Sequence, residues 1–301
     1  MVSEGRGVVL AGTGGRYRVL AEDREVMASL RGRLKLGRDH VVVGDTVTVA
    51  QHSDESWTIE HAHPRRTVLR RRQPGRTHGE RIVAANVEDV VVVGAAARPP
   101  WDPHLMDRFI AVGEANGLPV ILVINKRDLV DDPEPLAAPY RKAGYQVELT
   151  SVPDRRGLQQ LAAVLEGRVS FLTGPTGVGK SSLLNALQPG LKLRTGEVGR
   201  RGGRHTTVAA ELHRFGSHGL IADTPGLRDI GLWGLEPAEV ARAFPELARF
   251  AAGCRFYNCR HAGEPSCAVV EAADRDDISW SRLISYRTLL EEARAAARPW
   301  E

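Results

Sequence analysis

A glycine-rich segment at residues 174–181 has the residue types that bind phosphate groups. It reads Gly-Pro-Thr-Gly-Val-Gly-Lys-Ser and matches the pattern G-x-x-x-x-G-K-[ST]. Its glycines allow backbone N–H groups to surround phosphates, and the N-terminus of a following helix adds a favourable dipole. We expect Lys180 to contact the β- and γ-phosphates and the Ser181 hydroxyl to bind Mg²⁺. The expected phosphate-binding residues are Gly174, Pro175, Thr176, Gly177, Val178, Gly179, Lys180 and Ser181.

A second motif, at residues 125–128, has the residue types that recognise guanine. It reads Asn-Lys-Arg-Asp, follows the apolar run 120–124 and resembles the N-K-x-D motif of GTPases, although alone it would also fit a surface turn. The Asp128 carboxylate can accept hydrogen bonds from N1–H and the exocyclic amine of guanine, a pair that adenine does not present. Asn125 would tie the base to the loop, and the stem of Lys126 would cover its face. With the weaker motif after residues 147–149, the expected guanine-binding residues are Asn125, Lys126, Arg127, Asp128, Thr150 and Ser151.

Two further segments have residues that suit Mg²⁺ and the third phosphate. An Asp-Thr-Pro-Gly sequence, the D-x-x-G signature, begins at Asp223, which would hold Mg²⁺ through water, while the N–H of Gly226 would contact the γ-phosphate. Residues 203–207 lie between this signature and the phosphate-binding loop and match a switch I segment. One threonine of such a segment completes the Mg²⁺ shell, and we favour Thr207 slightly over Thr206.

The residue that orients the attacking water is not evident in these motifs. Leu227 follows Gly226, where many GTPases have a glutamine, and an apolar side chain cannot position water. His205 of switch I is a candidate, although a histidine there equally suits a loop or an RNA contact. We therefore expect slow intrinsic hydrolysis that a partner accelerates. The expected catalytic residues are Lys180, Thr207, Gly226 and His205.

The chain's three cysteines lie together with a histidine in the C-terminal region. Cys254, Cys259, His261 and Cys267 have the spacing C-x4-C-x-H-x5-C. Three thiolates and one imidazole suit a closed tetrahedral Zn²⁺ site, whose role would be structural because no position is left for water. Reduced cysteines beside a surface histidine are one alternative, and an iron–sulfur site is another.

The hydrophobic pattern divides the chain into three predicted domains, at residues 1–72, 73–235 and 236–301. Short runs broken by glycines indicate a small β-barrel in the first domain, either an OB-fold or another small barrel. Its expected strands are 8–10, 17–20, 33–36 and 45–50. An arginine-rich linker at residues 65–76 follows, and it is either a solvated connection or an arm that contacts phosphates.

In the second domain strands alternate with helices, which predicts a parallel, doubly wound α/β sheet. The expected strands are 90–93, 120–124, 147–149, 168–173 and 220–222, and the expected helices are 103–116, 158–165 and 181–187. The third domain is mostly helical, with helices expected at 238–250 and 280–297. The base motif precedes the phosphate-binding loop, which reverses the usual order and indicates a circular permutation. The permutation is tolerable because the strands and the cleft stay the same while the cut in the chain moves to the surface.

Composition sets broad limits on the partners and the location of the protein. The 301 residues have a formal net charge of +4, a mild basic excess that suits nucleic acid or ribosome binding but also occurs without such partners. No apolar run approaches the ~18–20 residues of a membrane span, and no hydrophobic signal core stands at the N-terminus. We expect a cytoplasmic monomer that does not bind membranes.

The order of the three domains resembles the ribosome small-subunit-dependent GTPase A family. The resemblance spans essentially the whole chain and includes residues 84–89, the phosphate-binding loop, switch I, the D-x-x-G signature and the cysteine–histidine cluster. It implies a cytoplasmic bacterial GTPase with GTP or GDP, Mg²⁺ and one structural Zn²⁺. It also implies that the protein binds the small ribosomal subunit late in maturation, contacts rRNA through an OB-like barrel, and hydrolyses GTP when the subunit stimulates it.

Two other functions are compatible with the same motifs. In the first, the protein is an RNA-binding assembly module that uses GTP as an affinity clamp, and turnover is incidental. In the second, it is a GTP-dependent metallochaperone, which would need a readily exchangeable zinc that a closed site does not offer.

Overall fold

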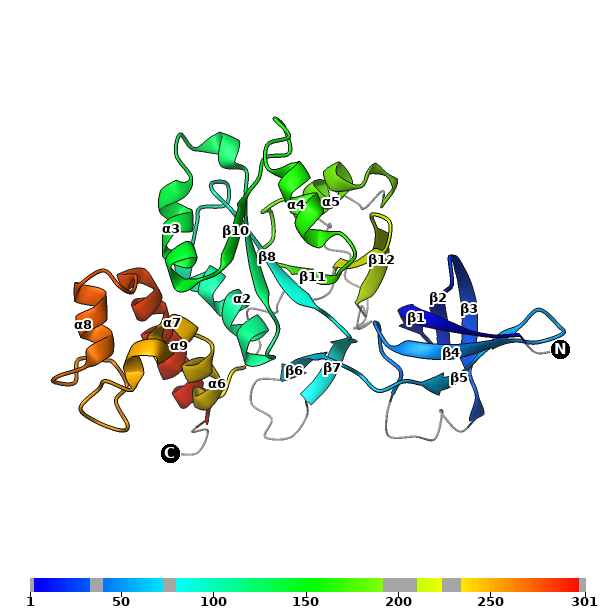
Figure 1. Cartoon of the computed structure of the whole chain (residues 1–301), viewed down its shortest axis with the longest axis horizontal. Coiled ribbons are helices and arrows are strands. Elements are labelled where there is room, and N and C mark those ends of the chain that lie inside the picture. The colour runs from blue at the N-terminus through cyan, green and yellow to red at the C-terminus, as the bar shows by residue number, and fades with distance from the viewer. Residues whose placement is uncertain (1–2, 33–39, 73–79, 192–209, 224–233, 298–301) are drawn as a thin grey trace, which may run out of the picture.

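The computed structural model of the chain describes residues 3–32, 40–72, 80–191, 210–223 and 234–297 (Figure 1). It contains a closed β-barrel, a two-stranded hairpin, a six-stranded α/β sheet and a group of helices, in chain order. The α/β part lies between the barrel and the helical part (Figure 1). Within the described ranges, no helix combines the length and the apolar character that crossing a membrane requires. This architecture confirms the predicted fold class.

Five strands close the barrel in the order β1-β2-β3-β5-β4, and only β3 and β5 pair in parallel. The strands are β1 (Ser3–Thr13), β2 (Arg16–Ala21), β3 (Arg24–Leu30), β4 (Thr46–Gln51) and β5 (Trp57–Ala62). Val47 and Val49 of β4 are fully buried between partly buried threonines, as the alternation in the sequence predicts. The sequence did not predict β3, in which only Ala28 is buried, or β5, and the predicted strand 33–36 lies outside the described residues.

A hairpin links the barrel to the α/β sheet. Its antiparallel strands are β6 (Val68–Arg72) and β7 (Glu80–Ala85). Directly after it, the Asn86 side chain donates a hydrogen bond to the Gly44 carbonyl (2.9 Å) and accepts one from the Arg66 N–H (2.8 Å). Arg65 binds the buried carboxylate of Asp45 with two hydrogen bonds, of 2.7 and 2.9 Å. The first arginine of the predicted linker is therefore part of the barrel's structure, and not of a solvated connection.

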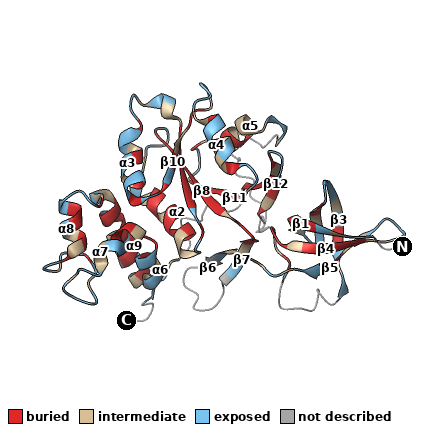
Figure 2. Cartoon of the chain, in the orientation of Figure 1, coloured by how far each residue is buried: buried red, intermediate tan, exposed pale blue. Residues whose placement is uncertain are grey.

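The sheet has the strand order β10-β9-β8-β11-β13-β12. The strands are β8 (Asp89–Ala95), β9 (Val120–Asn125), β10 (Gln146–Leu149), β11 (Val169–Thr173), β12 (Glu211–Phe215) and β13 (Gly219–Asp223). Every pairing is parallel except that of β12, which runs antiparallel to β13 at the edge. The sequence did not predict β12, which follows segment 192–209 and adds an antiparallel strand to the edge of an otherwise parallel sheet. The central strands β8 and β9 are buried along their whole length (Figure 2).

Helices cover both faces of the sheet. They are α2 (Pro103–Ala115), α3 (Glu134–Ala143), α4 (Leu158–Leu165) and α5 (Lys180–Leu187), with 3-10 turns η1 (Arg127–Leu129) and η2 (Pro189–Leu191). The buried side chains of α2 and α3 share one core with Val90, Val92 and Leu122. Those of α4 and α5 share a second core with Val91 and Val93. Successive residues of β8 thus enter opposite cores, which is the doubly wound arrangement that the sequence predicted.

The C-terminal part consists of four helices around their own core. They are α6 (Pro237–Arg242), α7 (Pro245–Ala251), α8 (Ala268–Asp274) and α9 (Trp280–Ala297). The sequence predicted one helix over 238–250, whereas the structure has two. Pro245 has no N–H to continue a helix and disfavours helical geometry in the residue before it, and Phe244 accordingly has φ −126° and ψ 75°.

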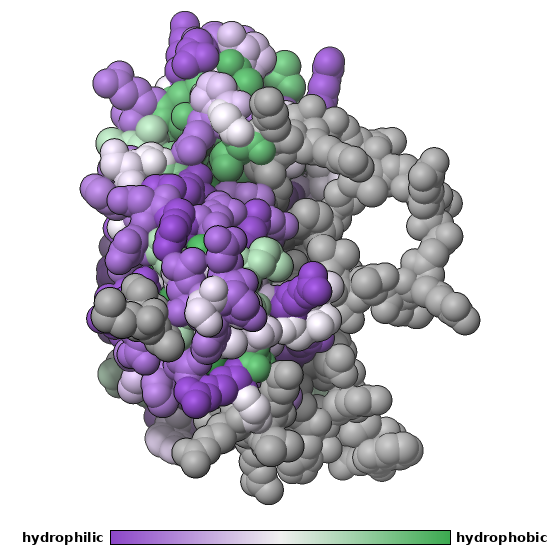
Figure 3. Space-filling view, turned by 90° about the vertical axis from the view of Figure 1, so that its right-hand side faces the viewer, coloured by the Kyte–Doolittle hydropathy of each residue, from purple (hydrophilic) through white to green (hydrophobic). Residues whose placement is uncertain are grey.

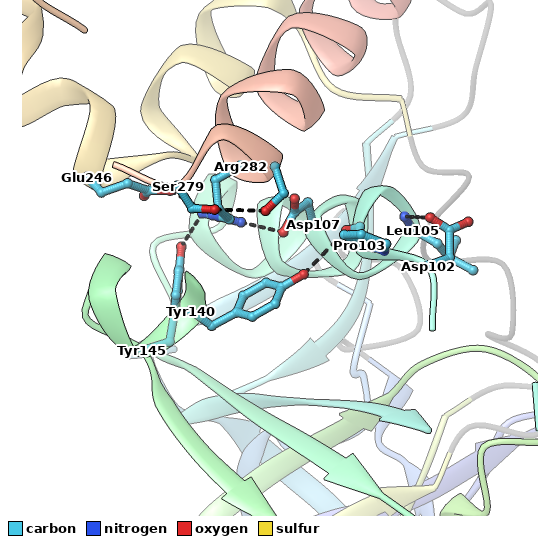
Figure 4. A network of polar contacts seen from close by, with 10 residues as sticks. Asp102, Pro103, Leu105, Asp107, Tyr140, Tyr145, Glu246, Ser279 and Arg282 are labelled. Atoms are coloured by element: carbon cyan, nitrogen blue, oxygen red, sulfur yellow. Dashed lines mark hydrogen bonds and ion pairs between the residues drawn. The ribbon is translucent and has the colours of Figure 1, made fainter. Parts of the chain in front are cut away.

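A buried ion cluster joins the C-terminal helices to the α/β part (Figure 4). Arg282 of α9 donates to Asp107 Oδ1 of α2 at 2.6 Å and to Glu246 Oε1 of α7 at 2.7 Å. Its guanidinium lies 4.5 Å from the ring centre of Phe244, and a 3.4 Å hydrogen bond reaches the hydroxyl of Tyr145. The side chain of Arg282 is 1% exposed and that of Asp107 is fully buried. The two parts of the chain are therefore held by charges that water does not screen.

Candidate nucleotide site and metal centre

The predicted phosphate-binding loop connects β11 to α5 at the ends of the parallel strands. Gly174, Gly177 and Gly179 have φ values of +138°, +83° and +98°, a region that side chains rarely adopt. A Cβ atom on Gly174 would lie 2.0 Å from the Val93 carbonyl oxygen. A Cβ atom on Gly179 would lie 2.6 Å from Nδ2 of Asn125. The loop therefore needs glycine both for its backbone turn and for its close contact with neighbouring strands.

The lysine and the serine of this loop stand at the start of α5. The Lys180 ammonium group is half-buried and donates hydrogen bonds of 2.7 Å to the carbonyls of Gly174 and Pro175. These two hydrogen bonds hold the ammonium group inside the curve of the loop backbone. Ser181 follows in the first helical turn and is partly exposed.

The predicted base motif lies beside this loop. Asn125, the last residue of β9, is 2% exposed and donates a 2.9 Å hydrogen bond to the carbonyl of Val178. Its side-chain oxygen accepts a 3.1 Å hydrogen bond from the hydroxyl of Thr150. Lys126 has a left-handed backbone, with φ +59°, and its ammonium group donates to the carbonyls of Gly177 (2.6 Å) and Arg98. Three segments that are distant in the sequence are thus hydrogen-bonded into one site.

The remaining residues of the base motif line the same end of the sheet. Asp128 is exposed in the turn η1, where a ligand can reach its carboxylate. The Arg127 N–H donates to the Thr150 carbonyl at 3.1 Å, which ties the motif to the end of β10. Thr150 and Ser151 are fully buried, so their side chains belong to the protein interior next to the site. The Ser151 N–H is bonded to the Arg156 carbonyl at 3.0 Å.

The predicted Mg²⁺ and γ-phosphate residues are only partly described. Asp223 is the last residue of β13, the neighbour of β11, which leads into the phosphate-binding loop. His205, Thr206, Thr207 and Gly226 lie outside the described residues. The sequence also missed the loop after β8, whose Arg98 carbonyl binds Lys126. The available signal was its position, because this loop follows the carboxyl end of a central parallel strand, where such sheets bind ligands.

The four predicted metal ligands lie together in the loop between α7 and α8. Their ligand atoms are all within 4.8 Å of one another. The distances from Cys254 Sγ are 3.5 Å to His261 Nδ1 and 3.9 Å to Cys267 Sγ, and His261 Nδ1 lies 3.3 Å from Cys267 Sγ. A tetrahedron with Zn–S bonds of about 2.3 Å and a Zn–N bond of about 2.0 Å has edges of roughly 3.5–3.8 Å. The donor set and its spacing therefore fit a zinc ion. His261 is only 7% exposed, so the alternative of a surface histidine beside reduced cysteines is wrong on this point.

Metal binding at this cluster requires the cysteine thiols to lose their protons. Burial raises the pKa of Cys259 to about 12, and burial lowers the pKa of His261. The imidazole is therefore ready to donate its lone pair, whereas thiol protons must be displaced by the metal ion. Partial burial raises the pKa of Glu264 in the same loop, but hydrogen bonds from the N–H groups of Arg260 and Ala262 outweigh it and lower the pKa to about 2.

Comparisons with known proteins agree over most of the chain. The model of the RsgA GTPase family matches residues 62–233. A relative from Gemmatimonas aurantiaca, named small ribosomal subunit biogenesis GTPase RsgA, is 50% identical over 304 residues, covering 97% of this chain and 98% of its own. One with the same name from Moorella thermoacetica is 40% identical over 296 residues, with the same coverage.

Two solved structures are similar over nearly their whole length. The crystal structure of YjeQ from Thermotoga maritima has a TM-score of 0.80 and 32% identity and covers 97% of this chain and 99% of its own. A structure described as YloQ, a circularly permuted GTPase, has a TM-score of 0.78 and 28% identity and covers 99% of this chain and 98% of its own. The barrel, the sheet and the C-terminal helices thus occur together in other proteins.

Proposed function

The chain belongs to the RsgA GTPase family, and from this membership we propose that its GTP hydrolysis serves the late maturation of the small ribosomal subunit. The reaction is GTP + H₂O → GDP + phosphate. We propose further that the subunit and its rRNA stimulate this reaction, and that the protein acts in the cytoplasm. Relatives that are named for small-subunit biogenesis match nearly the whole chain, which supports the proposal for all three parts of the molecule.

The observation that carries the nucleotide assignment is the position of Asn125. Its amide joins the phosphate-binding loop, at Val178, to Thr150 at the end of β10. A nucleotide whose phosphates lie in the loop therefore has its base next to Asp128, which is exposed on the same edge. The Asp128 carboxylate accepts from guanine N1–H and the exocyclic amine, and so selects GTP over ATP.

The chain's own groups stabilise the transferring phosphoryl by position and charge. Loop N–H groups and the Lys180 ammonium surround the β- and γ-phosphates. In the structure two loop carbonyls hold this ammonium, and phosphate oxygens would replace them with charge-assisted hydrogen bonds. Gly226 would contact the γ-phosphate, and His205 is the proposed organiser of the attacking water.

The proposed Mg²⁺ ligands come from several segments of the chain. Ser181, Asp223 and either Thr206 or Thr207 offer hydroxyl and carboxylate oxygens, the ligand type that Mg²⁺ prefers. Ser181 stands at the start of α5 and Asp223 ends the strand next to β11, so both lie at the same edge of the sheet. Bound Mg²⁺ neutralises part of the charge that develops in phosphoryl transfer.

The surface of the barrel supports an RNA partner. The end of the molecule that carries the barrel shows mainly hydrophilic side chains (Figure 3). Arg24 is exposed, and its guanidinium lies 5.0 Å from the ring centre of Trp57. Arginine stacked on an aromatic ring suits contact with both phosphates and bases. Exposed Arg16 adds positive charge to the neighbouring strand β2.

The test is GTP hydrolysis by the purified protein with and without purified small ribosomal subunits at fixed salt. Large subunits at the same concentration are the control. A strong stimulation that only small subunits give is the expected result. Tight GTP binding with no stimulation would refute the ribosome-triggered reaction and leave the affinity-clamp function, in which GTP only strengthens RNA binding.

A further inference from the structure

The backbone of His261 has a conformation that its neighbours must hold in place. Alone among the four proposed zinc ligands, it has a positive φ, of +58°. A non-glycine residue is uncommon in this left-handed region and costs free energy to keep there. The surrounding contacts therefore decide whether the imidazole faces the cysteines.

Glu264 binds the backbone N–H groups of the residues on both sides of His261. One carboxylate oxygen accepts from the Arg260 N–H at 2.9 Å, and the other accepts from the Ala262 N–H at 2.8 Å. Hydrogen bonds from N–H groups to a carboxylate are charge-assisted and strong. The carboxylate therefore clamps the turn that contains the histidine.

Arg287 of α9 fixes the carbonyl of the same residue from outside the loop. Its Nε donates a 2.5 Å hydrogen bond to the His261 carbonyl oxygen. The Arg287 side chain is half-buried. Its guanidinium lies 5.8 Å from the ring centre of Trp280, which also belongs to α9. The Tyr286 ring lies 5.9 Å from the imidazole ring. Helix α9 thus supports both the backbone and the ring of the histidine.

We propose that Glu264 and Arg287 are positioning residues of the metal centre, and that α9 is therefore part of it. They hold His261 so that Nδ1 stays 3.5 Å from Cys254 Sγ and 3.3 Å from Cys267 Sγ, the spacing of a tetrahedral site. Neither side chain would bind the ion. Mutation of a residue that orients a metal ligand commonly weakens metal binding by about 10- to 100-fold. The inference rests on the zinc assignment of the four ligands.

The test measures Zn²⁺ affinity of the full-length protein by competition with a chromophoric chelator. We expect Arg287→Met and Glu264→Gln each to weaken Zn²⁺ binding by about 10- to 100-fold. Arg260→Met is the matched control, because Arg260 lies in the same loop and carries the same charge. Within the described part of the chain, its side chain makes one long ion pair, of 3.8 Å with Glu264, and is 54% exposed. It should bind Zn²⁺ within about twofold of the wild-type protein.

Two further readouts separate positioning from general stability. Arg287→Lys keeps a donor near the carbonyl and should recover part of the lost affinity. Co²⁺ bound to Arg287→Met should have a visible spectrum that differs from the tetrahedral spectrum of the wild-type protein, whereas Arg260→Met should match the wild type. Equal Zn²⁺ affinity in Arg287→Met, Glu264→Gln and wild type would overturn the positioning roles. A wild-type protein that binds no Zn²⁺ would instead overturn the metal assignment.

Discussion

Replacing Arg282 by methionine should loosen the C-terminal helices from the α/β part. Methionine keeps most of the buried stem but removes the guanidinium. Asp107 and Glu246, whose side chains are 0% and 5% exposed, then lose hydrogen bonds of 2.6 and 2.7 Å. Breaking a buried ion pair on one side costs about 3–5 kcal/mol, because a charge remains buried without compensation. That free energy corresponds to an increase of roughly two to four powers of ten in the opening equilibrium of this junction.

Amide hydrogen exchange in α2 and α9 measures this opening locally, which matters because a chain of several domains has no single free energy of unfolding. The control is Arg275→Met, since the Arg275–Asp277 pair is 59% and 47% exposed and should change exchange by no more than about 0.5 kcal/mol. If exchange in Arg282→Met changes as little as in the control, the cluster does not hold the two parts together.

The Arg282→Met defect should also depend on pH. Burial raises the pKa of Asp107 above its ordinary 3.8, and Arg282 opposes that rise. A carboxyl group with a raised pKa in the folded state stabilises the fold below its unfolded pKa and loses this contribution as the pH rises through the folded pKa. Removing Arg282 raises the folded pKa further. The destabilisation should therefore be smallest in acid and grow towards neutral pH, and a defect that shrinks as the pH rises would contradict this reasoning.

The nucleotide site gives three further predictions. Asp128→Asn should weaken GTP and allow xanthosine triphosphate to bind, because the side chain then donates where it accepted; competition binding tests this, and unchanged preference would remove Asp128 from the base site. Lys180→Ala should cut the rate of GTP hydrolysis by about 100-fold or more, and a single-turnover rate equal to wild type would contradict the loop assignment. Gly179→Ala should weaken a fluorescent GTP analogue at least about tenfold, because its Cβ would lie 2.6 Å from Asn125 Nδ2 at φ +98°. Gly190→Ala, whose Cβ would meet no atom of the described residues within 4 Å apart from its chain neighbours, should bind that analogue like the wild type.

Local sequence signals predicted the elements that carry the nucleotide motifs. The buried strands β8 and β9 contain continuous apolar runs, and α4 begins and ends at the residues that the sequence indicated. Helix α3 was missed because its sequence contains Pro135 and Pro139, which argue against a helix. Pro135 stands in its first turn, where no N–H is needed, and a left-handed Gly144 ends the helix. Tertiary packing on the sheet then outweighs the cost of Pro139.

The residues that support the two sites could not be predicted from the sequence. Lys126 is held by the carbonyl of Arg98, and any residue type supplies a carbonyl. Arg287 lies 26 positions after His261, and nothing local distinguishes it from the other arginines of the same helix. Motifs of adjacent residues predict which groups can do the chemistry. The contacts that orient these groups depend on which distant segments the fold brings together.

Helix α9 contacts both the metal loop and the α/β part of the chain. Arg282 and Arg287 are five residues apart, which places them about 140° apart around a helix, so they face different neighbours. Arg282 binds Asp107 of the α/β part, while Arg287 binds the carbonyl of the proposed zinc ligand His261. The metal loop and the domain junction are therefore fastened to the same rigid element. A zinc ion bound by the loop would restrain α9 through Arg287, and a restrained α9 would keep Arg282 in its buried position. Metal binding and the attachment of the C-terminal helices should consequently strengthen each other, although their sites lie on different sides of the helix.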